Sequence, residues 1–179
     1  NESASLAFLA ASAAGVYVSA SAGNSGPGPA TLGHHEPWVA SVGASTHDRS
    51  FTNQLVDMTS DGVSLPDIDG VSLSAGYGPA PIVYAGDFED QFPGATLCGV
   101  GESVFPADGS SNPFPPNFFN GEIVVCDRGT YARVEKGFNV LQSGAGGYVL
   151  ANVDANGESI AADDHFLPAI HIGDQAGDA

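Results

Sequence analysis

The chain has 179 residues and a formal net charge of −17, from 21 acidic and four basic residues. A field of that sign repels nucleic acid and anionic membranes, so we expect neither as a partner. Hydrophobic residues make up 42% of the sequence, enough for a buried core. The sequence contains no apolar run near the ~20 residues of a membrane span and does not open with a signal peptide. Because Asn1 is not an initiator methionine, we expect a piece of a longer protein.

The first 15 residues predict the last turns of an amphipathic helix. Leu6, Leu9 and Ala13 recur at helical spacing, and the sequence around them is rich in alanine. Gly15 is typical of the residue that ends a helix.

Two strands are predicted next, over residues 16–20 and 38–44, with a loop rich in Gly and Pro between them. The second is apolar enough to be covered on both faces. Helix, strand, loop and strand in this order predict a fragment of a parallel α/β sheet. Two strands are too few to bury both faces of such a sheet by themselves.

The character of the sequence changes near Arg49. From there to about Asp90, short alternating segments predict a series of strands, with turns at 60–62 and 69–70. Residues 107–120 are rich in Pro, Gly, Ser and Asn and predict a long loop. The phenylalanines of that loop need apolar surroundings.

A strand–helix–strand unit follows, over residues 122–126, 131–143 and 147–151. In one sheet this order implies a right-handed parallel crossover. The helix is predicted to bury one apolar face, formed by Val134, Phe138 and Leu141. A final short strand is predicted at 169–172. The fold class expected for the whole chain is therefore mixed α/β.

Cys98 and Cys126 are the two cysteines of the sequence. A bridge between them would close a loop of about 28 residues and contribute roughly 3–4 kcal/mol in the loop-entropy model. The alternative is a pair of buried free thiols. No Cys-x-x-Cys spacing or nearby histidine completes a metal site, so we expect no metal and no cofactor.

The first strand ends in Ala22-Gly23-Asn24, and here the sequence resembles the subtilisin-like serine proteases. In that family such a strand supplies the side-chain half of the oxyanion hole, so the resemblance makes Asn24 that donor. It also places Ser21, Ala22 and Gly23 along the wall of the primary specificity pocket. An amide donates to a developing oxyanion without carrying charge itself. The alternative is an asparagine that suits a Gly-rich turn for backbone reasons alone.

The rest of the chain resembles the protease-associated (PA) domain that is inserted in plant-type subtilases. Five segments carry this resemblance, in the order of the family: 120–129, 132–137, 145–147, 150–152 and 162–169. The upstream segment 37–49 resembles the catalytic-domain strand that precedes the insertion. The resemblance implies that residues 1–48 are a segment of a subtilisin-like catalytic domain with a parallel α/β sheet. Residues 49–179 would be the PA domain, a mixed β-sheet flanked by short helices.

The resemblance implies part of a secreted serine endopeptidase, and an exported protein favours the bridge between Cys98 and Cys126. The expected partners are a polypeptide substrate and the remainder of the parent protease, with a homodimer as a further option. The PA domain would serve substrate recognition, substrate access or dimerisation. The family motifs that carry the catalytic Asp, His and Ser do not occur, so the chain alone should not hydrolyse peptides. The alternative is a stand-alone protein-binding PA module.

Overall fold

A computed structural model describes residues 2–45 and 49–177. The chain separates into two compact units, Asn1–Arg49 and Ser50–Ala179, and each is described by itself. The domain boundary predicted at residue 48 falls in the gap at 46–48, outside the described residues. Within the described ranges, no helix combines the length and the apolarity needed to cross a membrane.

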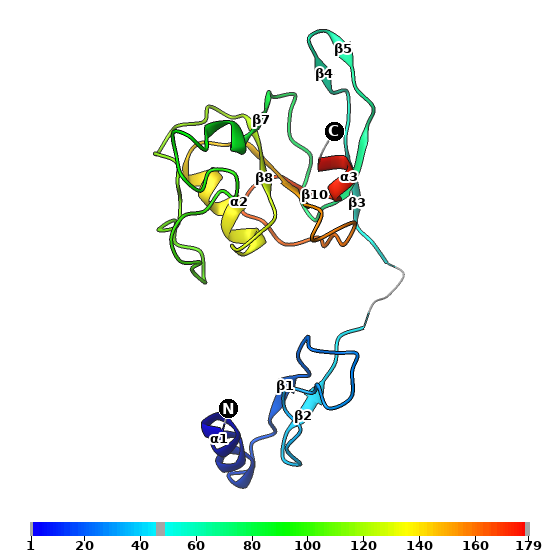
Figure 1. The fold of residues 1–179 in the computed structure, drawn as a ribbon, viewed down its shortest axis with the longest axis vertical. Helices are drawn as coiled ribbons and strands as arrows, with labels where there is room; N and C mark the ends of the chain where they lie inside the picture. The colour runs from blue at the N-terminus through cyan, green and yellow to red at the C-terminus, as the bar shows by residue number, and fades with distance from the viewer. Residues whose placement is uncertain (1, 46–48, 178–179) are drawn as a thin grey trace. The chain divides into compact units, whose positions relative to one another are not determined.

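The first unit consists of α1 (Glu2–Ala13), β1 (Ser19–Ser21) and β2 (Ala40–Val42) (Figure 1). The two strands pair in parallel, with Ala20 opposite Ser41. They form a two-stranded sheet. A parallel ladder is therefore present, whereas the larger subtilisin-like sheet that the resemblance implies stays a prediction.

The helix predicted at the start of the chain is present as α1. Gly15, at φ +84°, follows its end, in the left-handed region that favours glycine. The predicted apolar face is not buried in this unit, since the side chain of Leu6 is 60% exposed and Leu9 is also exposed. Phe8 makes an edge-on contact with the ring of His34, at 5.4 Å between centroids.

Both strands of this unit are shorter than predicted. The first begins three residues later than the predicted strand over 16–20, and Tyr17 is 83% exposed. The second covers only three of the residues 38–44. Trp38 lies before it and donates its indole N–H to the carbonyl oxygen of Ser5, at 3.2 Å. Apolar β-branched residues predicted longer strands, but pairing partners exist only over three residues on each side.

The second unit is built on one six-stranded mixed sheet with the order β3-β6-β10-β9-β8-β7. Strands β7 to β10 pair in parallel, while β6 pairs antiparallel with β10 and with β3. A separate hairpin, β4–β5, extends from the sheet (Figure 1). The strands and helices of this unit are β3 (Thr52–Leu55), β4 (Thr59–Ser60), β5 (Val63–Ser64), β6 (Ile68–Val71), β7 (Ile82–Tyr84), η1 (Ala85–Phe88), β8 (Ile123–Asp127), α2 (Arg133–Gln142), β9 (Gly147–Ala151), β10 (Ala169–Ile172) and α3 (Asp174–Gly177).

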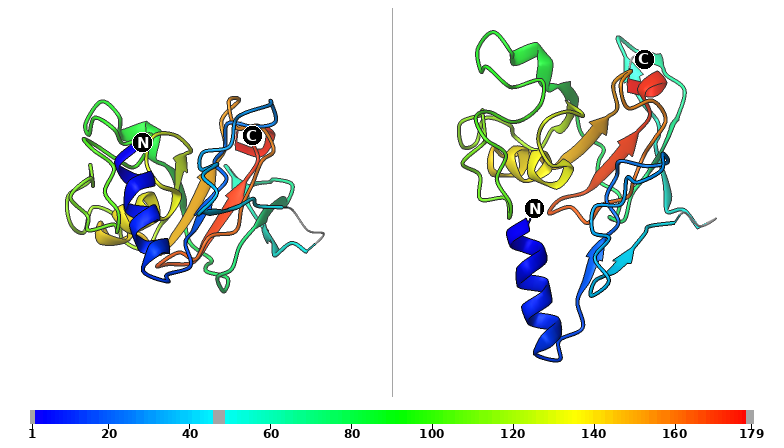
Figure 2. Two further views of the ribbon diagram at one scale, coloured as in Figure 1. Left: turned by 90° about the horizontal axis from the view of Figure 1, so that it is seen from below. Right: turned by 60° about the horizontal axis from the view of Figure 1, so that its bottom comes forward.

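Side chains on the central strands alternate between two cores, as the period of a strand requires. Helix α2 lies against one face of the sheet (Figure 2). Val124, Cys126, Tyr148 and Leu150 are buried on that face together with Val140 of α2. The residues between them pack on the opposite face in a second cluster, which α3 borders: Val149, Ala151, Ile170 and Ile172. The parallel crossover predicted for β8, α2 and β9 is therefore present.

One predicted turn is wrong. Asp69–Gly70 lies inside β6, where Gly70 pairs with Asn53. A Cβ atom at Gly70 would lie 2.7 Å from the carbonyl oxygen of His171, so glycine is required by the close approach of the neighbouring strand. The turn predicted at 60–62 does form, between β4 and β5.

The buried side of α2 carries polar side chains beside the apolar Val140. The prediction placed Val134, Phe138 and Leu141 in the core, yet all three are only partly buried. The polar side chains that α2 buries instead are Glu135, Lys136 and Asn139. They face the chain between η1 and β8, which has no helix or strand and must find other partners for its backbone.

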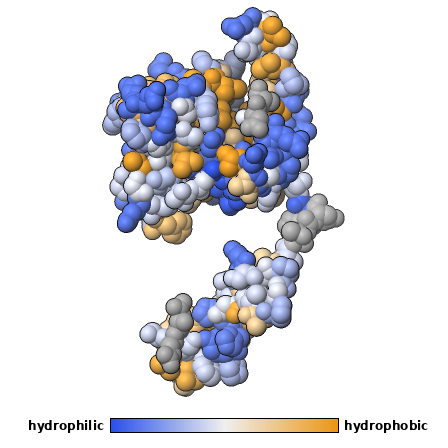
Figure 3. Space-filling model, viewed as in Figure 1, coloured by the Kyte–Doolittle hydropathy of each residue, from blue (hydrophilic) through white to orange (hydrophobic). Residues whose placement is uncertain are grey.

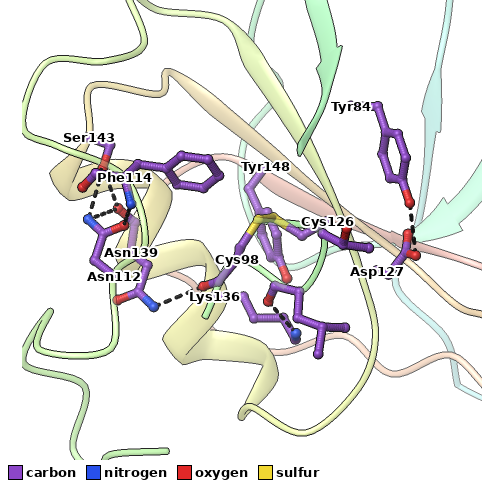
Figure 4. The surroundings of a disulfide bond; sticks show 12 residues. Tyr84, Cys98, Asn112, Phe114, Cys126, Asp127, Lys136, Asn139, Ser143 and Tyr148 are labelled. Carbon is purple, nitrogen blue, oxygen red and sulfur yellow. Dashed lines mark hydrogen bonds between the residues drawn. A yellow bond between two sulfur atoms is a disulfide. The ribbon is translucent and has the colours of Figure 1, made fainter. Parts of the chain in front are cut away.

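Two kinds of contact hold this irregular segment. Cys98 forms a disulfide with Cys126 of β8, with 5.8 Å between their Cα atoms (Figure 4). Asn139 donates from its amide nitrogen to the carbonyl oxygen of Cys98, at 2.9 Å, and to the hydroxyl of Ser111, at 3.1 Å. Asn112 reaches back from the segment to the carbonyl oxygen of Asn139, at 2.9 Å.

The predicted need of this loop for apolar surroundings is met by a cluster of aromatic rings. Phe114 and Phe119 are buried, and their ring centroids lie 5.0 Å apart. Five rings take part, mostly in the edge-to-face arrangement that aromatic quadrupoles favour: Phe88, Phe92, Phe114, Phe118 and Phe119.

Removing the disulfide should destabilise the second unit. The double variant Cys98→Ser/Cys126→Ser frees the loop in the unfolded chain, so we expect its free energy of unfolding to fall by about 3 kcal/mol. Urea unfolding followed by tyrosine fluorescence and circular dichroism measures the change. Intact mass before and after reduction and alkylation is the control on the starting protein. Two free thiols in protein made under oxidising conditions, or an unchanged urea midpoint, would contradict the prediction.

Candidate functional site

The predicted oxyanion segment lies where β1 ends. Ala22 continues the ladder by donating its N–H to the carbonyl oxygen of Val42, at 2.9 Å, and accepts from the N–H of Gly33, at 2.9 Å. Gly23 then adopts φ +86°, which turns the chain away from the sheet. Asn24 follows this turn with an exposed side chain. The local fold thus presents an uncharged amide at the carboxyl end of a parallel strand, a usual place for chemistry in α/β sheets.

A shallow hollow of about 290 Å³ lies beside this turn. Of the predicted specificity-pocket residues, Ala22 and Gly23 line it, whereas Ser21 does not. The remaining lining residues come from the loop that follows: Gly26, Gly28, Ala30, Thr31 and Leu32. Small side chains and glycines leave room here for a group to approach the backbone.

The described hydrogen bonds of this unit link no hydroxyl group to a histidine ring. Ser41 donates its hydroxyl to the main-chain carbonyl of His34 rather than to the ring. The ring of His34 lies 3.8 Å from a carboxylate oxygen of Glu36, and that carboxylate accepts from the hydroxyl of Ser5. Hydrogen bonding to Ser5 holds the pKa of Glu36 below its usual value. The exposed amide of Asn24 is free of charge and can donate a hydrogen bond, whereas acyl transfer also needs a nucleophile and a base.

Lys136 is the most unusual titratable group of the second unit, because it is fully buried. Its ammonium donates to the carbonyl oxygen of Leu97 and lies 5.3 Å from the centroid of the Tyr131 ring. Burial lowers the pKa of Lys136 to about 8, against the opposing attraction of Asp127 and Glu135. Sequence reasoning missed this polar centre, although Glu135, Lys136 and Asn139 share one helical face by their spacing.

A second buried polar group surrounds His171. Its Nε2 lies 2.8 Å from Oδ1 of Asn152, which only accepts, so Nε2 carries the proton. Its Nδ1 accepts from the N–H of Ala161, at 3.0 Å. Burial lowers the pKa of His171, which favours the neutral ring. The ring thus links Asn152, at the end of β9, to Ala161, in the loop before β10, which is a structural role.

No group of three or more His, Cys, Asp or Glu side chains suited to a metal ion lies within 2–45 and 49–177.

Comparison with known proteins gives a family model within the second unit and relatives that match both units. The family model for the PA domain matches residues 79–179. Subtilisin-like protease SBT1.4 of Arabidopsis thaliana is 39% identical over 99% of the chain, which corresponds to 21% of that protein. Subtilisin-like protease SBT1.7 is 39% identical over 95% of the chain and 21% of its own length, and SBT5.6 is 35% identical over 88% and 18%. The chain therefore spans about a fifth of the length of these relatives.

The buried amine of Lys136 predicts a pH dependence of stability. The folded state loses this proton above pH 8, whereas a lysine in the unfolded chain keeps it to about pH 10. The unfolded state then binds more protons, so the free energy of unfolding should rise between pH 8 and pH 10, with a slope of up to about 1.4 kcal/mol per pH unit. Urea unfolding at several pH values measures the slope.

The variant Lys136→Met should lose most of this slope, whatever its absolute stability. Measurements stop at pH 10 because the pKa of Tyr84 is raised to about 12 in the folded state. Above pH 10 the folded state therefore binds more protons at this group, and the free energy of unfolding falls as pH rises. Equal slopes for the two proteins would contradict the assignment.

Proposed function

This chain belongs to the PA domain family, and since it is also similar to plant subtilisin-like proteases over nearly its whole length, we propose that it is part of an extracellular serine endopeptidase of that type. The carrying observation is that one similarity extends over both units, at 39% identity over 99% of the chain. A stand-alone PA module would not require the first unit. An extracellular location agrees with the disulfide between Cys98 and Cys126.

In this proposal residues 1–48 contribute to the catalytic domain. Asn24 donates to the oxyanion of the tetrahedral intermediate, and its position after a parallel strand supports that role. Ser21, Ala22 and Gly23 form one wall of the primary specificity pocket, and the hollow beside Ala22 and Gly23 supports this placement. The nucleophile, its base and the orienting carboxylate come from the remainder of the parent protease.

The second unit, residues 49–179 in this proposal, acts in substrate recognition or access, or in dimerisation. Its rigid parallel core supports a positioning role, because loops carried on such a scaffold present fixed surfaces to a polypeptide. The alternative is a protein-binding PA module that functions without a protease around it. Sequencing the gene on both sides of the segment decides between these two, since the first requires motifs that carry the catalytic Asp, His and Ser.

The chain by itself should show no peptidase activity. It lacks the family's nucleophile and base motifs, and an oxyanion donor alone gives no acyl-enzyme. Release of dye-labelled peptides from casein by highly purified chain is the measurement, with buffer from a mock purification as the control. Turnover that follows this protein through purification would refute the assignment.

In the parent protease, Asn24→Ala should lower kcat by about 10²–10³-fold with little change in KM, a magnitude known for the equivalent donor of a subtilisin. The reason is that the donor acts on charge that develops only in the transition state. Asn53→Ala, an exposed asparagine of β3, is the matched control and should keep full activity. A kcat equal to that of the control would remove Asn24 from the catalytic machinery.

A further inference from the structure

A groove of about 470 Å³ lies on the second unit, at the N-terminal end of α2. One wall is the segment 104–107, the second is the first turn of α2, and the third is formed by Asp163 and Phe166. The first wall is held in place because the N–H of Val104 donates to the buried carboxylate of Glu135, at 2.8 Å. The groove is thus a fixed feature of the fold.

The lining of this groove is mostly apolar, and two aromatic rings on it face solvent. The side chain of Phe105 is 93% exposed, and that of Phe166 is 61% exposed. Phe166 keeps one edge contact, with Phe138 of α2, at 5.0 Å between ring centroids. Exposed aromatic side chains beside a concave apolar surface are typical of a site that binds another molecule.

The unit that carries the groove has a large negative net charge. Of the 21 acidic residues of the chain, 18 lie in residues 50–179, together with three basic residues. All three basic side chains have partners within the unit: Arg128 bonds Ser159, Arg133 pairs with Asp163, and Lys136 bonds Leu97. In the view of Figure 3, hydrophilic residues cover much of the visible face of this unit.

Three carboxylates stand next to the lining residues in the chain. Glu102 lies two residues before Val104, Asp108 follows Ala107, and Asp164 follows Asp163; all three side chains are exposed. Because Arg133 is occupied by Asp163, its charge does not offset them. An occupant of the groove therefore meets a mostly apolar lining, and exposed carboxylates lie within two residues of that lining along the chain.

We propose that this groove binds a polypeptide segment that inserts one large apolar side chain between Phe105 and Phe166 and carries basic residues on both sides of it. Complementary charge steers and orients such a segment, and a buried aromatic or aliphatic anchor supplies most of its affinity. The proposal rests on the recognition role given above to the PA unit, and it names the class of polypeptide. A second copy of the chain is disfavoured as the occupant because each copy carries a net charge of −17.

The test uses the full chain and a fluorescein-labelled peptide, Gly-Lys-Lys-Ser-Phe-Ser-Lys-Lys-Gly, in fluorescence anisotropy. Two control peptides replace the central Phe by Ser, or all four Lys by Glu. The parent peptide should bind at least about tenfold more tightly than either control, because each control lacks one of the two required features. Its affinity should fall as salt rises from about 50 to about 300 mM, since exposed charges are screened. Equal binding of all three peptides would overturn the proposal.

Variants locate the binding site. Phe105→Ala should weaken binding by about tenfold, whereas Phe51→Ala, an exposed phenylalanine just before β3, should leave it unchanged. Glu102→Gln/Asp164→Asn should weaken binding at low salt and have little effect at about 300 mM. Thermal unfolding confirms that each variant is folded. Peptide binding that survives Phe105→Ala places the site elsewhere and overturns the assignment.

Other occupants give different results. A dimer in sedimentation velocity that dissociates on Phe105→Ala would make the groove a contact between copies. Peptide binding by the chain but not by the intact parent protease would make it a contact with the rest of that protein. Either result refutes the inference and leaves the proposed function standing, because the latter depends on the effect of Asn24→Ala on kcat. If the proposed function is wrong, Asn24→Ala will leave kcat unchanged, whatever the result of the peptide-binding experiments.

Discussion

The second unit depends on satisfying the backbone of the irregular segment between η1 and β8. That segment packs against a buried helix and sheet without forming either, so its polar groups must find partners one by one. Helix α2 supplies these partners from three polar side chains of a kind that is usually exposed to solvent: Glu135, Lys136 and Asn139. The disulfide fixes the same segment covalently to β8, next to the amide contact made by Asn139 (Figure 4).

This constraint also shapes the surface. The carboxylate of Glu135 accepts from the backbone N–H of Val104 and, at 2.6 Å, from the hydroxyl of Ser111. Burial alone would raise the pKa of Glu135, but these bonds and a further one from Ser103 outweigh it and hold the pKa below its usual value. The carboxylate therefore stays ionised in the core, and the segment it holds leaves Phe105 exposed over the groove. One buried carboxylate thus couples the stability of the irregular segment to the geometry of a surface site. Such coupling explains how an irregular segment can present a rigid binding wall.

The regular part of this fold is predictable from the sequence, and the irregular part is not. Strands β8, β9 and β10 are short apolar runs separated by glycines and one helix, so local pattern alone locates them. For α2, the local pattern predicts burial of Val134 and Phe138 because apolar side chains at helical spacing usually face the core. It does not predict burial of Asn139, because the partners of that side chain lie 28 and 41 residues earlier in the chain. Gly70 resembles a turn residue because its real constraint, the carbonyl oxygen of His171, comes from a strand far later in the sequence. Long-range polar partners and close backbone approaches leave no local pattern.

The two units differ in how well they bury their own apolar residues, and this difference bears on the candidate site. The second unit has two buried clusters on either side of its sheet. The first unit leaves Leu6, Val16 and Tyr17 exposed around a ladder of three residue pairs. A large apolar side chain left in water forgoes roughly 1.5–3 kcal/mol of burial, so these residues together form a substantial unburied surface. The proposed place within a larger catalytic domain accounts for that surface, because the sheet and helices of that domain would cover it on both faces. In the oxyanion role proposed for Asn24, its amide would reach catalytic precision only with that cover present, since an oxyanion donor acts through preorganisation rather than through its mere presence.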